Sequence, residues 1–222
     1  GCEKCCSRKR RQFDKCQYVR SKSSRIYERA NDFSSQSGQK VQNLDMKIGI
    51  DASRANKDNK TGVEWYSYHL IEQFKKIDHE NEYFLYSNHK LTSALADCPQ
   101  NFKSRRIKWY IPRTWTIFRL GLHVRFGKNK PDVLFMPASS LPVIFPRKSV
   151  VTVHDIGFVH FPELYPWADR FYHKLFMLWI KVFATKIIAV SHYTKKDLIE
   201  TYKIKPEKIE VVYNGYDGVS YK

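Results

Sequence analysis

The sequence predicts an α/β protein with a Rossmann-like, doubly wound and mostly parallel sheet. Residues 150–158 read VVTVHDIGF, an apolar run that stops at a His-Asp pair. Such a run is typical of a strand buried on both faces, and strands of that kind belong to parallel sheets covered by helices. Residues 187–217 then give strand, polar turn, helix, Pro-marked loop, strand and Asn-Gly turn. This alternation indicates βαβ units with right-handed crossovers.

Seven strands are expected. Four are predicted at residues 47–51, 82–87, 106–110 and 132–136, and three more in the runs VVTV, IIAV and IEVVY. The first helix is marked by Thr61 and Glu64, which have the Thr-x-x-Glu spacing of a capping box. Apolar residues recur along it at steps of three and four, which predicts its core face. They are Val63, Tyr66, Leu70, Phe74 and Ile77.

A second amphipathic helix is predicted near residues 167–182. Its apolar positions are Trp167, Phe171, Leu175, Leu178 and Val182. Arg170, Lys174 and Lys181 are expected on the opposite side, so the apolar side is predicted to pack in the core. No stretch reaches the ~20 uninterrupted apolar residues that a membrane span requires, and no secretory signal is visible.

Composition and charge divide the chain into a leader and a body. Hydrophobic residues make up 42% and aromatic residues 15%, which favours a globular body over a disordered chain. We expect a poorly ordered or non-native basic leader at residues 1–45 and one domain at residues 46–222. The net charge of +17 divides into +6 and +11 between them. Nucleic acid, anionic lipid and phosphorylated substrates would all be attracted by such a surface.

The cysteines also divide unevenly, because only Cys98 lies in the body. This distribution favours a reduced, cytoplasmic domain without disulfides. In the leader, Cys2 and Cys5 have the gap of a zinc knuckle, but no second pair and no nearby His completes it. Zinc binding and reversible lipidation are therefore minor alternatives for the leader, and no metal is expected.

Five short motifs follow one another in the body. They are IGIDASR (48–54), KTGVEWYSYHL (60–70), TVHD (152–155), AVSHYTKKDL (189–198) and VVYNGYD (211–217). Together they resemble the amino-terminal half of a family 4 glycosyltransferase, a retaining sugar transferase with two Rossmann-like domains in the GT-B arrangement. The resemblance runs from about Met46 onward and implies that residues 46–222 are the acceptor-side domain, ending at the interdomain linker.

The resemblance also implies substrates and a second domain. In the family, the carboxyl-terminal domain binds the nucleotide-sugar and carries a Glu, seven residues, Glu motif, which this chain lacks. We therefore expect a fragment that is inactive alone and binds no cofactor by itself. A GDP- or UDP-sugar donor, a glycan or lipid-linked acceptor and a cytoplasmic location, peripheral on the inner membrane face, are implied for the whole enzyme.

Gly62, Val63 and Glu64 are candidates for an acceptor and diphosphate loop. They open the first helix, whose unpaired N–H groups and dipole suit an anion. The equivalent glycine-containing loop of the family faces the interdomain cleft. The alternative is that Gly62 only starts the helix and Glu64 only caps it.

His154 and Asp155 are the candidate catalytic residues. They follow a buried strand, and open α/β sheets bind ligands at the carboxyl ends of their strands. An imidazole can donate or accept a hydrogen bond near neutral pH. In the family, a His in the TVHD-type position contacts the donor sugar. The alternatives are a His bonded to a neighbouring loop and an Asp that caps a turn.

The two carboxyl-terminal motifs supply weaker candidates. Ser191, Lys195 and Lys196 are possible phosphate or cleft contacts, although solvated lysines are commoner. Thr194 and Asp197 have capping-box spacing at the same helix. Asn214 and Gly215 predict a tight turn that the family uses to approach the interdomain hinge.

The segment 109–128 bears on the partner. Trp115, Phe118, Leu122 and Phe126 share a predicted helical face, with Arg and Lys between them. Such a helix suits either packing on the sheet, which is favoured, or an anionic membrane interface. The rival function is a non-catalytic basic binding module. Nucleic acid is the less favoured partner because the aromatics fall at core spacing and no nucleic-acid motif is found.

Overall fold

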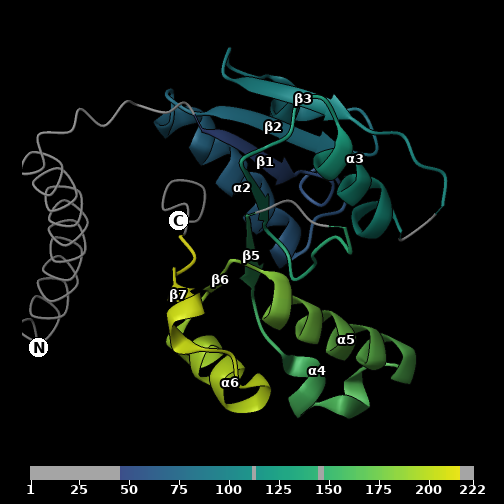
Figure 1. The fold of residues 1–222 in the computed structure, drawn as a ribbon, viewed down its shortest axis with the longest axis vertical. Coiled ribbons are helices and arrows are strands. Elements are labelled where there is room, and N and C mark those ends of the chain that lie inside the picture. The colour runs from purple at the N-terminus through teal and green to yellow at the C-terminus, as the bar shows by residue number, and fades with distance from the viewer. Residues whose placement is uncertain (1–45, 112–113, 145–147, 216–222) are drawn as a thin grey trace, which may run out of the picture. The chain divides into compact units, whose positions relative to one another are not determined.

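A computed structural model describes residues 46–111, 114–144 and 148–215 of the chain. They belong to one compact unit, Asp45–Lys222, built around a seven-stranded sheet (Figure 1). The strand order is β3-β2-β1-β4-β5-β6-β7, and every pair is parallel. The expected doubly wound sheet is confirmed. The proposed leader, with its cysteines, lies outside the described residues.

The sheet and its connections alternate as expected. The strands are β1 (Lys47–Asp51), β2 (Glu82–Ser87), β3 (Phe102–Arg106), β4 (Val133–Met136), β5 (Ser149–Val153), β6 (Lys186–Ala189) and β7 (Ile209–Val211). The α-helices are α2 (Gly62–Ile77), α3 (Gly121–Phe126), α4 (Gly157–His160), α5 (Trp167–Phe183) and α6 (His192–Tyr202). A π-helix, η2 (Trp115–Leu120), leads into α3, and short 3-10 turns lie at η1 (Ser93–Ala96), η3 (Pro162–Leu164) and η4 (Pro206–Lys208).

Two hydrophobic clusters cover the two faces of the sheet. Alternate residues of β2 enter opposite clusters. Tyr83 and Leu85 belong to the cluster on the side of α2, whereas Phe84 and Tyr86 belong to the larger cluster that also contains residues of α3, α5 and α6. From β1, the strands β2 and β3 are added toward one edge of the sheet, and from β4 the strands β5, β6 and β7 are added toward the other edge. The winding of the chain therefore reverses between β1 and β4. In open α/β sheets this reversal marks the place where ligands bind.

The third strand lies four residues earlier than the sequence predicts. The expected strand at 106–110 is wrong, since β3 is Phe102–Arg106. Phe102 is buried and stacks on Tyr83 with ring centroids 4.3 Å apart. The rest of β3 is polar because it is an edge strand with mostly exposed side chains. An apolar run is a poor guide to such a strand.

The core face of α2 is rotated from the expected one. Ile77 is 71% exposed, whereas Ile71 is fully buried. Buried polar residues complete the face: Ser67 donates to the carbonyl of Val63, and the Lys75 ammonium donates to the carbonyls of Ala94 and Asp97. A prediction based only on apolar residues does not find the buried face of α2, because that face includes the polar residues Ser67 and Lys75.

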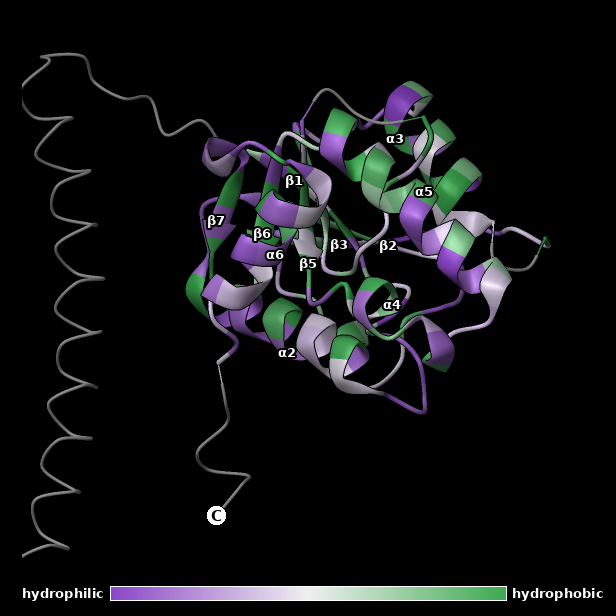
Figure 2. Ribbon diagram, turned by 90° about the horizontal axis from the view of Figure 1, so that it is seen from below, coloured by the Kyte–Doolittle hydropathy of each residue, from purple (hydrophilic) through white to green (hydrophobic). Residues whose placement is uncertain are grey.

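The apolar stripe of α5, defined as Trp167, Phe171, Leu175, Leu178 and Val182, is exposed. The prediction that it packs in the core is wrong, since all five side chains are at least half exposed. The core side is instead formed by Phe176, Met177 and Ile180. Apolar residues occur on the core side of α5 as well as in the exposed stripe, so periodicity alone did not separate the two sides. Hydrophobic segments, coloured green, recur along the helix in Figure 2.

The favoured prediction for 109–128 is also wrong in its detail. Trp115 is buried, but Phe118, Leu122 and Phe126 of the same predicted face are exposed. The intervening π-helix shifts the register, and Leu120 and Val124 become the buried residues. Among the described residues, no helix has the length and apolarity needed to cross a membrane.

Replacing Ile71 and Ile77 separately tests the face of α2. We expect Ile71→Ala to lower the free energy of unfolding by about 2 to 4 kcal/mol, because it leaves a cavity in the core. Ile77→Ala, the matched control, should change it by less than about 0.5 kcal/mol. Urea unfolding followed by circular dichroism measures both, and equal losses would contradict the described helix orientation.

Candidate functional site

The candidate site lies along the edge where the parallel strands end. β1, β4, β5 and β6 lead there into Asp51, Pro137, His154 and Ser191. The loop between β1 and α2 crosses this edge beside the reversal of winding. The sheet therefore brings residues of the motifs at 48–54, 152–155 and 189–198, together with Pro137, to one side of the domain.

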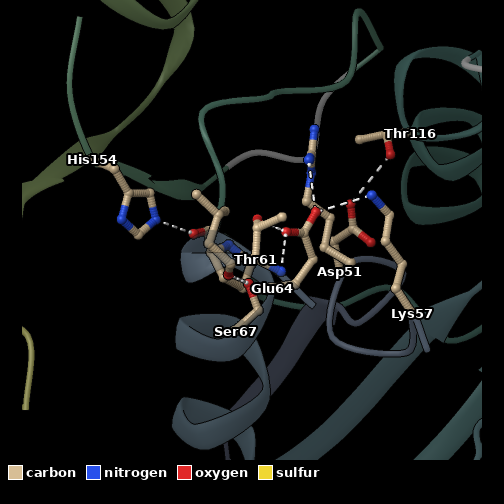
Figure 3. A network of polar contacts seen from close by, with 10 residues as sticks. Asp51, Lys57, Thr61, Glu64, Ser67, Thr116 and His154 are labelled. Atoms are coloured by element: carbon tan, nitrogen blue, oxygen red, sulfur yellow. Dashed lines mark hydrogen bonds and ion pairs between the residues drawn. The ribbon is translucent and has the colours of Figure 1, made fainter. Parts of the chain in front are cut away.

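Asp51 ends β1 as a buried carboxyl group. It accepts hydrogen bonds from the backbone N–H of Ser53 at 2.9 Å and from the Thr116 hydroxyl at 3.3 Å. Burial raises the pKa of Asp51 above its ordinary value, although these hydrogen bonds and the nearby Arg54 oppose the rise. Asp51 thus ties the β1 loop to η2 (Figure 3).

Glu64 is the centre of the loop's charge network. Its carboxylate accepts from the Thr61 backbone at 3.2 Å and from the Thr61 hydroxyl, and it pairs with Lys57 at 2.9 Å and Arg54 at 3.3 Å (Figure 3). Burial opposes ionisation, but the combined hydrogen bonds and the Lys57 charge lower the pKa of Glu64 to about 2. The predicted capping box is confirmed.

His154 is held by contacts from three different elements. Its Nε2 lies 3.1 Å from the carbonyl oxygen of Pro137, and its ring packs edge-on against Tyr66 with centroids 4.8 Å apart. The Thr194 hydroxyl donates to the His154 carbonyl at 3.1 Å. These contacts fix both the ring and the backbone at the end of β5.

The contact with Pro137 also decides the tautomer of His154. A carbonyl oxygen only accepts, so Nε2 carries the proton, and in the neutral ring Nδ1 is then an acceptor. Burial lowers the pKa of His154 below its ordinary value, and Arg54 adds to this, while Pro137 and Asp155 oppose it. Near neutral pH, His154 is therefore a neutral acceptor that suits a sugar hydroxyl.

Asp155 lies beside His154 but makes a local contact. Its Oδ1 accepts from the backbone N–H of Gly157 at 2.9 Å, which caps the turn into α4. Asp155 therefore takes the alternative role considered from the sequence, that of an Asp that caps a turn. Its side chain is exposed, and its charge raises the pKa of His154.

The residues at the start of α6 divide into structural and exposed groups. Ser191 caps the helix by accepting from the backbone N–H of Thr194 at 3.0 Å, so the expected cap at Thr194 with Asp197 is wrong. Asp197 instead contacts His160 at 2.7 Å. The Lys195 ammonium donates to the Ile209 carbonyl at 2.7 Å, while Lys196 is exposed.

The remaining predicted residues are placed without strong contacts to the network. Gly62 and Val63 open α2, and no atom lies within 4 Å of the position a Gly62 side chain would take. That space leaves the backbone accessible to a ligand. Asn214 and Gly215 are exposed after β7.

Sequence reasoning missed two residues of the site, Arg54 and Tyr66. Tyr66 was assigned to the core because of its helical spacing, yet it contacts His154 and lies 3.4 Å from the Thr152 hydroxyl. Arg54 lies three residues after the end of β1, and this position near a strand end was the feature of the sequence that could have marked it as a site residue. Within the described ranges, no group of three or more His, Cys, Asp and Glu residues is placed to hold a metal ion.

Comparison with models of known protein families identifies the family of this chain. The model of Glycosyltransferase Family 4 matches residues 60–218, most of the chain and all of the site motifs from α2 onward. The chain belongs to glycosyltransferase family 4. The O-antigen chain mannosyltransferase RfbU of Salmonella typhimurium strain LT2 is 25% identical over an alignment of 182 positions, and the match covers 75% of this chain and 48% of RfbU.

A solved structure supports the fold of this family 4 domain. Anabaena HepE, crystallised with UDP and glucose, aligns with a TM-score of 0.50 at 18% identity, covering 78% of this chain and 45% of HepE. The likeness supports the GT-B type of Rossmann-like domain. The chain spans about half the length of each of these two proteins.

The tautomer and protonation of His154 can be measured directly. We expect nitrogen-15 NMR to show the proton on Nε2 and a titration midpoint below the ordinary pKa of about 6.5, because burial disfavours the charged ring. A proton on Nδ1 in the neutral ring would refute the assignment.

Glu64→Gln tests the charge network. The folded-state pKa lies below the ordinary one, so the carboxylate stabilises the fold above about pH 4.5 and this stabilisation is lost as the pH falls toward 2. We expect the variant to lose about 1 to 2 kcal/mol at pH 7, with the difference from wild type shrinking in acid. Denaturant unfolding at several pH values measures it. Exposed Glu80→Gln is the control, and a difference independent of pH would contradict the network.

Proposed function

We propose that this chain is the acceptor-side half of a retaining, nucleotide-sugar-dependent glycosyltransferase. The family match supports the reaction class, and His154 is the observation that carries the residue assignment. In the reaction, the acceptor oxygen forms a bond to the anomeric carbon as the bond to the nucleotide diphosphate breaks. The acceptor proton leaves with the diphosphate, and the configuration at the anomeric carbon is retained.

His154 is proposed to position the donor sugar rather than to remove a proton. Its Nδ1 accepts a hydrogen bond from a sugar hydroxyl, because Nε2 is occupied by the Pro137 carbonyl. Tyr66 and Thr194 hold the ring and backbone in place, so the acceptor atom is preorganised. This restrained arrangement is well suited to orienting a substrate.

The names of two relatives support a proposal for the donor and the acceptor. RfbU is named a mannosyltransferase of the O-antigen chain, and HepE was crystallised with UDP and glucose. We propose a GDP- or UDP-hexose donor and a glycan or lipid-linked acceptor on the cytoplasmic side. Most of the donor contacts are assigned to a second domain, so residues 1–222 alone are proposed to be inactive.

The decisive experiment compares His154→Ala with His79→Ala in the full-length enzyme. Transfer from radiolabelled GDP-mannose and UDP-glucose to membrane-extracted acceptor should fall by about a hundredfold or more for His154→Ala. His79→Ala should keep full activity because His79 is an exposed loop residue that precedes β2, away from the carboxyl ends. Undiminished transfer by His154→Ala would refute its role.

A second measurement tests whether the nucleotide-sugar is bound by this chain or by another domain. Calorimetric titration of residues 1–222 with either nucleotide-sugar should show no binding at micromolar concentration. The full-length enzyme under the same conditions provides the positive control. Clear binding by the shorter chain would contradict the assignment of the donor site to another domain.

A further inference from the structure

A row of polar side chains crosses the carboxyl ends of β1, β2 and β3. Asp51, Tyr86 and Arg105 are register partners on these three adjacent strands, and register partners on parallel strands point to the same face of a sheet. Asp51 accepts a hydrogen bond from Thr116 of η2, and Tyr86 packs against His123 of α3. The row therefore lies beneath η2 and α3, on the face of the sheet opposite α2.

Tyr86 is the centre of this row and carries an unpaired hydroxyl group. Its side chain is fully buried, and within the described ranges its hydroxyl has no hydrogen-bond partner. A buried hydroxyl without a partner destabilises a fold, so in a native protein it calls for an explanation such as a bound ligand. Burial raises the pKa of Tyr86 to about 12, against the opposing charge of Arg105. The hydroxyl therefore keeps its proton and can donate a hydrogen bond.

Three basic side chains gather beside Tyr86, and all three are partly buried. Arg105 is its neighbour on β3, and the Arg105 guanidinium carbon lies 5.4 Å from the centre of the Phe84 ring. The His123 imidazole meets the Tyr86 ring edge-on, with centroids 5.6 Å apart. Burial lowers the pKa of His123, and the charges of Arg119 and Arg105 lower it further. Two guanidinium groups and one imidazole thus share one place beneath η2 and α3.

The two guanidinium groups lack acidic partners in the part of the chain that the structure describes. Neither Arg105 nor Arg119 forms a salt bridge there. Residues 99–153 contain eleven Lys or Arg and a single acid, Asp132. Asp132 accepts from the backbone N–H of Lys47 at 2.8 Å, at the amino end of β1 and away from this place. Partly buried cations without an acid favour an anion as their partner.

We propose that Arg105, Arg119, His123 and Tyr86 form a binding site for a phosphoryl group. A guanidinium presents paired N–H donors that match phosphate oxygens, and the imidazole and the phenol add two further donors. A phosphoryl group has three strong acceptor oxygens for these donors, whereas a carboxylate has two. The site lies on the other face of the sheet from α2, so it is separate from the loop at Gly62. The proposal does not depend on the transfer reaction.

Nuclear magnetic resonance of the histidine rings in the 222-residue chain tests this site. The probe is sulfate, a phosphoryl analogue that does not titrate near neutral pH, and His123→Gln assigns the His123 signal. We expect sulfate to shift this signal saturably and to raise the pKa of His123, because a bound anion offsets the charges of Arg105 and Arg119. Sulfate binding should accordingly tighten as the pH falls and the ring takes up its proton. A signal that sulfate does not shift saturably would overturn the proposal.

Arg105→Gln and Arg119→Gln test the two guanidinium groups. Each should weaken sulfate binding by about tenfold or more, because charge-assisted hydrogen bonds are lost. Arg106→Gln is the matched control, since it removes the same charge from the next residue of β3, whose side chain points to the other face. Arg105→Lys, which keeps the charge but loses the paired donors, should also weaken binding. Equal weakening by Arg106→Gln would show attraction through net charge alone and overturn the site.

Tyr86→Phe separates ligand binding from folding. In the free chain, loss of an unpaired hydroxyl should leave Tm unchanged or slightly higher, because no hydrogen bond is broken. Saturating sulfate should raise Tm by mass action, and the rise should be smaller in the variant because one donor to the anion is missing. An equal rise in both proteins, or a clearly lower Tm of the free variant, would remove Tyr86 from the site.

The source of the phosphoryl group is tested with glucose 6-phosphate and inorganic phosphate, using Arg119→Gln to measure binding elsewhere on the chain. Binding of the sugar phosphate that is tighter by about fivefold or more would identify a phosphorylated sugar as the ligand, because the sugar adds contacts. Equal binding would identify free phosphate, and the site stands in both cases. Acetate is the carboxylate probe, and acetate binding as tight as phosphate binding would overturn the assignment to a phosphoryl group.

Discussion

The parallel pairing of β1 with β4 is the contact on which the rest of the site depends. It joins Ile48 to Val133 and Ile50 to Phe135 at the centre of the sheet, where the winding reverses. Because crossovers are right-handed, helices on the two sides of this pair lie on opposite faces. The loops that leave β1 and β4 therefore diverge at the carboxyl edge of the sheet, where His154 follows the neighbouring strand β5.

Few charged groups take part in the contacts that hold His154 in place. Pro137 directly follows β4, and its carbonyl fixes one nitrogen of His154. α2 contributes Tyr66 from one side of the sheet and α6 contributes Thr194 from the other, so the two helical layers meet at one residue. The Glu64 network separately holds the loop that begins α2. The position of His154 at this edge therefore depends on backbone and aromatic contacts, and the charged groups are concentrated in the neighbouring loop between β1 and α2.

The sequence was a good guide wherever burial was complete. Strands such as β5, covered on both faces, read as uninterrupted apolar runs, and the strand end at His154 followed from them. It was a poor guide where an element is exposed or apolar all round. β3 is polar because it is an edge, and α5 has apolar residues both toward the core and toward solvent. Tyr66 has the spacing of a core residue, so only tertiary structure shows its contact with His154.

The composition of β3 has a consequence for how the protein behaves at high concentration. An edge strand presents unpaired backbone groups that can recruit a strand from another molecule. β3 carries Lys103, Arg105 and Arg106 among its five residues, and Lys103 and Arg106 are exposed. Two such edges brought together would place like charges at the spacing of neighbouring strands, which disfavours their pairing. The polar character that hid this strand from prediction thus protects the sheet from extending into aggregates.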